Sequence, residues 1–382
     1  MPLSLPADPP TARSLTGVVP QMMRSLAGDP DWFPAARSAV VVVVDGLGRG
    51  NLSARSGHAR FLSAHMGRKD AARTVFPATT ATALTSLLTG TSAGVHGIVG
   101  YRARVPGTLV APNQLKGWET DGLDPLTWQR AQPLFERREG EGLPSFVVSK
   151  GSYRATGFTR AIQRGATFVD ASSPDERIEV AASLASEHTG ALVYVYLPEL
   201  DTIGHAQGWE SDAWFAGLER LDAAVRRLAD RVAGGDRGTG IVVTADHGMV
   251  DVPAHRQVLL GEGDPLLGEV DLVAGEPRLL QLYTDRGEGA VARIAERWRE
   301  REQERSWIMT RDEAVAAGLY GPRVDAEVLP RIGDVLVAAR SAVAYYDDRL
   351  DDKRAQRMIG QHGSLTDQER IVPLIRLGAF AR

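Results

Sequence analysis

Short runs of consecutive apolar residues recur along the chain, and amphipathic helical patterns separate them. The strand-like runs cover residues 39–44, 144–148, 192–197, 240–244 and 279–284, and the helical patterns cover 83–88, 176–187 and 214–233. Continuous Val/Ile/Leu strands that alternate with helices are typical of a parallel sheet buried on both faces. The sequence therefore predicts an α/β fold with a central, mostly parallel sheet and helices on both faces. In such a sheet, ligands bind beyond the carboxyl ends of the strands.

Changes in composition divide the chain into three predicted regions. Residues 1–37 are rich in proline, with one helical stretch at 18–28, and we expect an irregular or helical extension there. A catalytic core is predicted for 38–252 together with 355–382. Between these two parts, residues 253–354 combine glycine and proline with a helical segment at 289–303 and a strand-like pair at 331–344. We expect this segment to form an inserted, smaller cap.

The composition limits the kinds of partner and of metal site. A net charge of −4 gives no electrostatic reason to expect a nucleic-acid polymer or a membrane as partner. The sequence contains no cysteine, so that oxygen and imidazole ligands must hold any metal. No signal-peptide pattern and no apolar run of membrane-spanning length are visible, which predicts a cytoplasmic enzyme acting on a small molecule. The oligomeric state is not encoded in any readable pattern.

The first candidate functional residue is Asp45, which ends the run VVVVDG at 41–46. A dinucleotide-binding turn would need the spacing G-x-G-x-x-G, but the glycines at 46, 48 and 50 give G-x-G-x-G. An aspartyl phosphatase usually has a second aspartate two residues later, where this chain has Leu47. Two interpretations remain from this stretch alone, a turn-forming Asp-Gly pair and a metal ligand.

The segment LPELDTIGHAQG at 197–208 contains a second candidate pair. Asp201 and His205 are four residues apart, and on a helical turn both side chains can face one point. A carboxylate and an imidazole at this spacing suit zinc or a similar divalent ion. A hydrogen bond between the two at the start of a helix is the alternative.

Two further histidine motifs follow. In TADHGM at 244–249 a buried strand ends in Asp246 and His247, and Gly248 lets the chain leave the regular pleat, so that both side chains can reach one ion. His362 lies in GQHG at 360–363. Taken alone, His362 would be an ordinary loop histidine. We consider it a candidate ligand because it would complete a metal site.

A threonine pair precedes an apolar helical stretch in FPATTATALTSLLTG at 76–90. At the start of a helix, backbone N–H groups and the helix dipole favour an anionic phosphate. Thr79 and Thr80 could equally be plain helix caps. A threonine hydroxyl becomes a useful nucleophile only when a metal or a base lowers its pKa.

These motifs together supply the ligands of two metal ions. The ligand candidates are Asp45, Asp201, His205, Asp246, His247, His362 and one threonine. Two divalent ions about 4 Å apart that hold the attacking and the leaving oxygens are the usual apparatus of in-line phosphoryl displacement. One shared site explains the five motifs better than five unrelated structural roles.

The motifs also occur in a known order. VVVVDGLG (41–48), FPATTATALTSLLTG…HGIVG (76–100), YLPELDTIGH (196–205), TADHGM (244–249) and GQHG (360–363) resemble the alkaline phosphatase superfamily, in its type I phosphodiesterase/nucleotide pyrophosphatase branch. The resemblance implies an alkaline phosphatase-like core. It also implies one zinc ion on Asp201, His205 and His362, and a second on Asp45, Asp246, His247 and the nucleophilic threonine.

The resemblance further implies a phospho-enzyme intermediate and favours Thr80 as its nucleophile, since the family nucleophile lies ten residues before the glycine matched by Gly90. Thr79 is the alternative. Family diesterases carry an asparagine that donates to a phosphate oxygen, and the matching position in this chain is Tyr101. We expect the Tyr101 hydroxyl to donate to that oxygen instead. The predicted substrate is a phosphate diester or a nucleotide. Alternatives are a phosphonate hydrolase, a phosphomonoesterase, or a catalytically silent metal-binding homologue.

Overall fold

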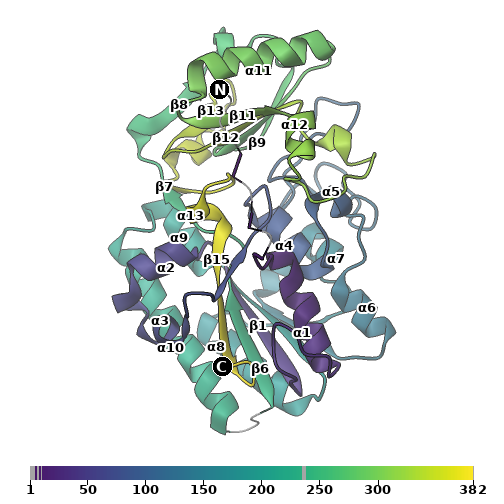
Figure 1. Ribbon diagram of the computed structural model, residues 1–382, viewed down its shortest axis with the longest axis vertical. Helices are drawn as coiled ribbons and strands as arrows, with labels where there is room; N and C mark the ends of the chain where they lie inside the picture. Colours follow the sequence, from purple (N-terminus) through teal and green to yellow (C-terminus); the bar gives the residue numbers. More distant parts are fainter. Residues whose placement is uncertain (1–4, 7, 10, 235–237, 382) are drawn as a thin grey trace.

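A seven-stranded sheet forms the centre of the larger part of the molecule (Figure 1). The computed structural model describes residues 5–6, 8–9, 11–234 and 238–381. Five neighbouring strands of this sheet are parallel, and the two strands at one edge are antiparallel to their neighbours. In spatial order, the strands are β2 (Ala71–Arg73), β15 (Ile371–Gly378), β6 (Thr239–Thr244), β1 (Ser38–Val44), β5 (Leu192–Leu197), β3 (Ser145–Ser149) and β4 (Thr167–Asp170).

Strand β1 lies at the middle of this sheet because its five consecutive valines can be buried on both faces. All seven of its residues are buried, and β-branched side chains favour the extended backbone. It pairs in parallel with β5 and β6, and the register places Val44 opposite Leu197 and Val43 opposite Thr244. The carboxyl ends of these three strands therefore meet at one edge of the sheet.

Helices cover the sheet in two layers (Figure 1). One layer contains α8 (Pro174–Glu187), α10 (Asp212–Gly234) and α3 (Arg60–His65), and the other contains α1 (Val18–Leu26), α4 (Thr80–Thr89) and α6 (Leu134–Gly140). The long helix α10 shows the expected amphipathic pattern, since its buried residues include Trp214, Leu218, Leu221, Val225 and Leu228. Further helices are α2 (Arg49–Ala54), α5 (Ala93–His96), α7 (Gly157–Ile162), α9 (Glu199–Gln207) and α13 (Asp367–Arg370). The predicted α/β architecture is confirmed.

A second, antiparallel sheet lies beyond one end of the first, with the green helix α11 packed on it (Figure 1). Its strands, in spatial order, are β11 (Ser306–Thr310), β12 (Val335–Ala339), β10 (Leu279–Tyr283) and β9 (Leu272–Glu276), with α11 (Glu288–Glu302) and α12 (Arg311–Ala316) beside them. The run 279–284, which we grouped with the parallel strands, is β10 of this sheet. An apolar strand buried on both faces gives no sign of its partners' direction, so this assignment was wrong.

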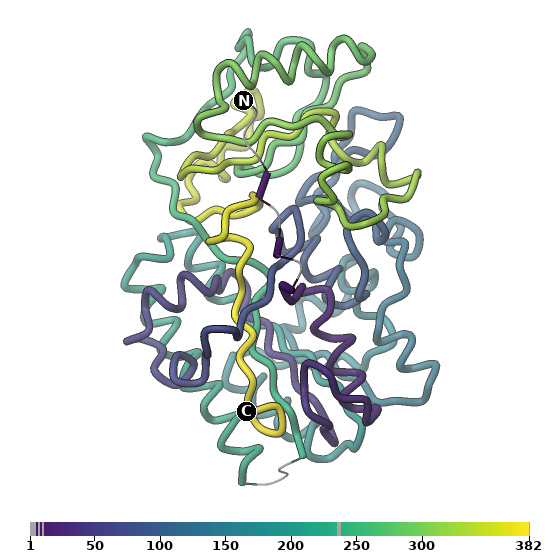
Figure 2. The backbone as a smooth tube through the Cα atoms, in the orientation of Figure 1, coloured from purple at the N-terminus to yellow at the C-terminus, as the bar shows by residue number. Residues whose placement is uncertain are grey.

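The strand-like pair predicted at 331–344 is also divided between two sheets. Its first member is β12, whereas β13 (Ala344–Asp347) pairs in parallel with β8 (Gln257–Leu260). The chain then returns to the large sheet through β14 (Gly360–Gln361), which pairs with β7 (Val250–Asp251), and ends in β15 (Figure 2). The limits of the predicted cap at 253 and 354 stay a prediction.

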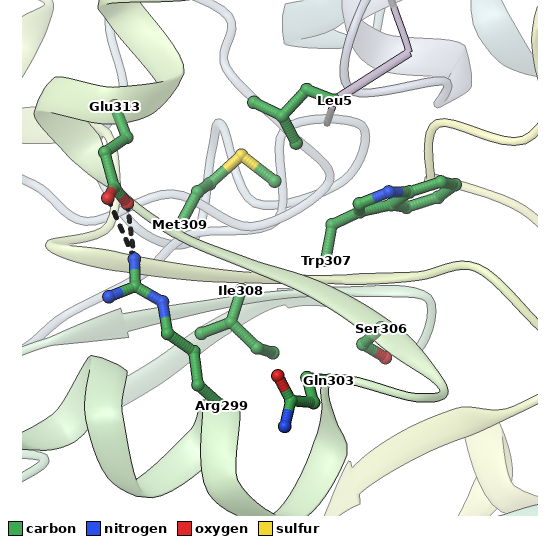
Figure 3. Close-up of a pocket in the computed structure, with 8 residues that line it drawn as sticks. All are labelled: Leu5, Arg299, Gln303, Ser306, Trp307, Ile308, Met309 and Glu313. Atoms are coloured by element: carbon green, nitrogen blue, oxygen red, sulfur yellow. Dashed lines mark hydrogen bonds and ion pairs between the residues drawn. The ribbon is translucent and has the colours of Figure 1, made fainter. Parts of the chain in front are cut away.

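The outer edge of the second sheet carries a cavity that is separate from the predicted site. It has a volume of about 220 Å³ and lies against the edge strand β11, where Arg299 and Glu313 form an ion pair at 2.7 Å (Figure 3). Its lining residues include Leu5, Trp307 and Met309, and none of the predicted site residues. Within the described ranges, no helix is long and apolar enough to cross a membrane.

Candidate metal centre and active site

Three aspartates lie together at the shared edge of β1, β5 and β6. Asp45 directly follows β1, Asp246 comes just after β6, and Asp201 lies in α9, which follows β5. Gly46 has a left-handed φ of +74°, and a Cβ atom there would lie 3.2 Å from Asp201. The Gly46 N–H also donates to Asp246 Oδ1 at 3.1 Å. The glycine therefore lets the turn after β1 approach both other carboxylates.

The three predicted histidine ligands all present the same ring nitrogen to this cluster. Nδ1 of His205 contacts the Gly360 carbonyl at 2.7 Å, Nδ1 of His247 the Gly248 carbonyl at 3.1 Å, and Nδ1 of His362 the Ala78 carbonyl at 3.0 Å. A carbonyl can only accept, so each Nδ1 carries the proton, and each Nε2 keeps a free lone pair. This is the usual arrangement of histidines that bind a metal.

The donor atoms form two overlapping groups. Asp45, Asp246 and His247 form one group, and Asp201, His247 and His362 form the other, with the donor atoms of each group within 4.8 Å of one another. His247 Nε2 lies 3.3 Å from Asp45 Oδ1 and 3.5 Å from Asp246 Oδ2.

His205 completes the set at one side of these groups. Its Nε2 lies 3.3 Å from Asp201 Oδ1, and its ring centre is 5.2 Å from that of His362. All six predicted carboxylate and imidazole ligands therefore lie together. The resemblance placed His205, rather than His247, with Asp201 and His362.

The chemistry of this cluster fits divalent cations. One buried oxygen of each aspartate has no hydrogen-bond partner in the described part of the chain: Asp45 Oδ1, Asp201 Oδ1 and Asp246 Oδ2. Within the same ranges, their ion-pair partners are histidines only. A cation would satisfy these oxygens, and three carboxylates with three imidazoles form a donor set that zinc accepts.

Burial and mutual repulsion affect the protonation of the cluster. Burial raises the pKa of Asp45 well above its ordinary value, Asp201 and Asp246 raise it further, and the Tyr196 hydroxyl, which donates to Asp45 Oδ2, opposes this effect. Burial also lowers the pKa of His362 well below its usual value, with His247 and His205 adding to the effect. His362 is therefore neutral, as a metal ligand must be.

The two candidate threonines point to different partners. Thr79 is the N-cap residue of α4, and Thr80 is the first residue of the helix. The Thr80 hydroxyl lies 3.1 Å from Nε2 of His247. The Thr79 hydroxyl faces Glu276 instead. Burial raises the pKa of the Glu276 carboxyl well above its ordinary value, and the Thr79 hydroxyl opposes this effect. Thr80 is therefore the threonine whose hydroxyl is directed at the ligand cluster.

A cavity of about 290 Å³ opens beside Thr80. Its lining includes Tyr153, Phe158 and Tyr196, and Lys116 lies at its side. These aromatic rings could accommodate the organic part of a substrate.

Tyr101, the predicted substrate-binding residue, lies close to the same cluster. Burial raises the pKa of its hydroxyl, an effect that the Asn113 side chain opposes by a hydrogen bond and that the charges of Glu276 and Asp201 reinforce. The hydroxyl therefore remains a hydrogen-bond donor at neutral pH.

Two residues beside the site were not identified from the sequence. Tyr196 lies five residues before Asp201 on β5, and its hydroxyl donates to Asp45. Its place near the carboxyl end of the apolar run 192–197 could have indicated that Tyr196 lies near the end of β1. Glu276 reaches the site from β9 of the second sheet, and no pattern in the sequence links that strand to the metal ligands.

Comparison with known proteins identifies one family that this chain matches. The type I phosphodiesterase/nucleotide pyrophosphatase family matches residues 39–365, whereas comparison with curated protein sequences gives no match.

Several solved structures share the fold. Murine ectonucleotide pyrophosphatase/phosphodiesterase 5 has a TM-score of 0.67 at 16% identity, over 88% of this chain and 87% of that chain, and an inactive variant of it in complex with AMP gives the same values. The human protein covers 90% of both chains at the same score and identity. Phosphonoacetate hydrolase from Sinorhizobium meliloti, in complex with phosphonoformate, has a TM-score of 0.67 at 19% identity, over 90% of this chain and 91% of that chain. The family match covers most of the sequence, and the chain therefore belongs to the type I phosphodiesterase/nucleotide pyrophosphatase family, whose members are hydrolases of phosphoric ester or phosphoanhydride bonds.

Proposed function

We propose that this enzyme is a two-zinc phosphodiesterase or nucleotide pyrophosphatase with Thr80 as its nucleophile. The observation that carries the proposal is the position of the Thr80 hydroxyl, 3.1 Å from Nε2 of His247. The same nitrogen lies 3.3 Å from Asp45 Oδ1 and 3.5 Å from Asp246 Oδ2, two oxygens without a hydrogen-bond partner in the described residues. A hydroxyl in such a place is activated when the neighbouring ligands hold a cation.

The ligands divide between two ions. Asp45, Asp246, His247 and Thr80 would hold one zinc ion, and Asp201, His205 and His362 would hold the other. When bound, the ions lower the pKa of the Thr80 hydroxyl and of the attacking water, and neutralise charge on the phosphoryl oxygens.

The residues of the chain supply the remaining parts of the reaction. The Thr80 hydroxyl loses its proton to solvent as its oxygen forms a bond to phosphorus, and the ester oxygen departs with the electron pair of the bond that breaks and takes up a proton from solvent. Water then attacks phosphorus, the bond between Thr80 and phosphorus breaks, and one proton of the water restores the Thr80 hydroxyl as the phosphate product is released. The N-terminus of α4 and the Tyr101 hydroxyl donate to the phosphoryl oxygens. The organic group that remains on phosphorus fits the cavity lined by Tyr153 and Phe158.

The substrate class is a phosphate diester or a nucleotide. The cavity beside Thr80, about 290 Å³ with aromatic walls, supports an ester with an organic group on phosphorus. Phosphonate hydrolysis is the second candidate, because phosphonoacetate hydrolase is among the structures that share the fold. A phosphomonoesterase and a catalytically silent homologue complete the set of alternatives.

A leaving-group screen on one preparation tests this proposal. The zinc-loaded enzyme is given bis-p-nitrophenyl phosphate, p-nitrophenyl phosphate, dinucleotides and phosphonoacetate, and kcat/KM is compared. The proposal expects the diester or the dinucleotides to give the highest value. A preference for phosphonoacetate would favour the second candidate, and no hydrolysis of any substrate would favour the silent homologue.

A further inference from the structure

The turn between β9 and β10 brings the second sheet close to His362, one of the candidate metal ligands. The turn consists of Pro277 and Arg278, and Glu276 is the last residue of β9 before it. Gly275, also in β9, has a left-handed φ of +82°, and a Cβ atom there would lie 2.1 Å from the Leu279 carbonyl oxygen. The Gly275 N–H donates to the carbonyl of Arg102 at 3.0 Å, next to Tyr101. The second sheet therefore touches the site through this turn.

Glu276 lies behind one of the metal ligands. It is 7% exposed, and its Oε2 atom lies 3.7 Å from Nδ1 of His362, the nitrogen that donates to Ala78. This distance is that of a charge contact rather than of a hydrogen bond. On its other side, the carboxyl group of Glu276 faces the Thr79 hydroxyl. Neither Oε1 of Glu276 nor that hydroxyl has a hydrogen-bond partner among the described residues.

The loop that carries His362 leaves space for this carboxylate. Gly363 has a φ of +127°, and a Cβ atom there would lie 2.5 Å from Cδ of Glu276. The Gly363 carbonyl accepts from the N–H of Ala78 at 3.1 Å, which joins the His362 loop to the segment before Thr80. A glycine is therefore required at position 363, since any side chain there would displace Glu276 from His362.

A buried ion pair holds the same turn to the same loop. Arg278 and Glu369 are both inaccessible, and they form two charge-assisted hydrogen bonds, at 2.7 and 2.8 Å. Glu369 also accepts from the N–H of Ser364 at 3.0 Å, two residues after His362. Bidentate arginine–carboxylate pairs fix geometry as well as contributing energy. The relative position of Glu276 and His362 is therefore fixed.

We propose that Glu276 is a positioning residue whose charge strengthens His362, a ring oriented by its hydrogen bond to Ala78, as a ligand of the zinc ion held with Asp201 and His205. The inference rests on the proposed two-zinc function. A carboxylate beside the Nδ1–H of a metal-bound histidine attracts the positive charge that the ring acquires on binding the metal and so raises its basicity, and removal of an outer-shell partner typically lowers metal affinity about 10- to 100-fold. We expect the effect to be confined to one of the two ions, because His362 is the one proposed ligand that Glu276 contacts among the described residues, and its other neighbour, the Thr79 hydroxyl, is not a proposed ligand.

The test measures zinc affinity rather than turnover. Metal-free wild-type protein and the Glu276→Gln variant are titrated with Zn²⁺ in competition with a chromophoric chelator. The wild type is expected to bind two equivalents, and Glu276→Gln to weaken one of them about 10- to 100-fold. In a His362→Ala background, which already lacks this ligand, Glu276→Gln is expected to cause no further loss. Glu302→Gln is the matched control. Glu302 is a buried glutamate that accepts from Arg305 and Tyr345, away from the metal cluster. The two zinc affinities of this variant should equal those of the wild type.

Each result has a definite meaning. If Glu276→Gln binds both equivalents as the wild type does, or loses both equally, the inference on Glu276 is overturned and the proposed function stands. If the wild type binds fewer than two equivalents, the proposed function itself fails. Should circular dichroism show that Glu276→Gln is unfolded, Glu276→Asp carries the same comparison, since it keeps the charge but withdraws it from His362 by one methylene.

Discussion

The hydroxyl of Thr80 lies 3.1 Å from Nε2 of His247. Nδ1 of the same imidazole contacts the carbonyl of Gly248, so that the ring presents a lone pair, not a proton, to the threonine. The neighbouring Thr79 faces the second sheet. This relationship separates two adjacent threonines that the sequence alone leaves as alternatives.

Thr80→Ala is expected to lower kcat at least about 10³-fold, because a nucleophile that acts as part of a unit cannot be replaced by its neighbour. Zinc content, measured by inductively coupled plasma mass spectrometry, should remain near that of the wild type, since the other six proposed ligands persist around the two ions. Thr79→Ala is the control and should retain most of the activity. Full activity in Thr80→Ala together with loss in Thr79→Ala would reverse the assignment.

Asp45→Asn is expected to stabilise the metal-free protein at neutral pH and to abolish one equivalent of zinc binding. Burial, together with Asp201 and Asp246, raises the pKa of Asp45, so the folded protein binds this proton more tightly than the unfolded chain does. Its contribution to stability is present at acid pH and is lost as the pH rises through the folded-state pKa. The asparagine carries no charge to bury. Thermal unfolding with and without zinc measures both effects, and a less stable metal-free variant at pH 7 would contradict this account.

Much of the candidate site could be predicted because its proposed ligands follow the ends of adjacent parallel strands. Asp45 and Asp246 each end a continuous apolar run, and parallel strands bring such ends to one edge. The antiparallel pairing of β10 and the antiparallel direction of β15 could not be predicted, because an apolar run does not specify its partner's direction. Glu276 could not be predicted either, since the fold of the second sheet brings it to His362, and nothing in its local sequence does so.

Tyr101→Phe is expected to lower kcat/KM about 10-fold, with zinc content unchanged. Its hydroxyl remains protonated because burial raises its pKa, and it is the donor that we assign to a phosphoryl oxygen. Losing one donor to a developing charge typically costs about 10²-fold or more at a dedicated oxyanion site, and the N-terminus of α4 retains the other donors here. Steady-state kinetics with the best substrate of the screen measure the change. An unchanged kcat/KM would show that Tyr101 does not contact the phosphoryl group.

The stability of the protein is expected to fall in acid partly through His96. Burial, with the charge of Arg331, lowers the pKa of His96 from 6.5 to about 3, and its ring bonds to Ser86 and to the Ile98 N–H. Between these values the unfolded chain binds a proton that the folded protein does not, so stability rises with pH in this window and is lost as the pH falls.

This contribution amounts to about 2–3 kcal/mol between pH 7 and pH 4.5. Urea unfolding of metal-free protein at the two pH values measures it. His96→Gln should be less stable at pH 7 but should lose about 2–3 kcal/mol less on acidification than the wild type does. An equal loss in both proteins would exclude His96 as a source of acid sensitivity.

The most direct test of the two-zinc mechanism is to locate the covalent intermediate. Zinc-loaded enzyme is mixed with bis-p-nitrophenyl phosphate, quenched in acid during turnover and digested for peptide mass spectrometry. The account predicts an adduct on Thr80 that retains one p-nitrophenyl phosphoryl group, absent after chelation of the metal and absent from Thr80→Ala. An adduct on Thr79 or on any other residue, formed under the same conditions, would contradict it.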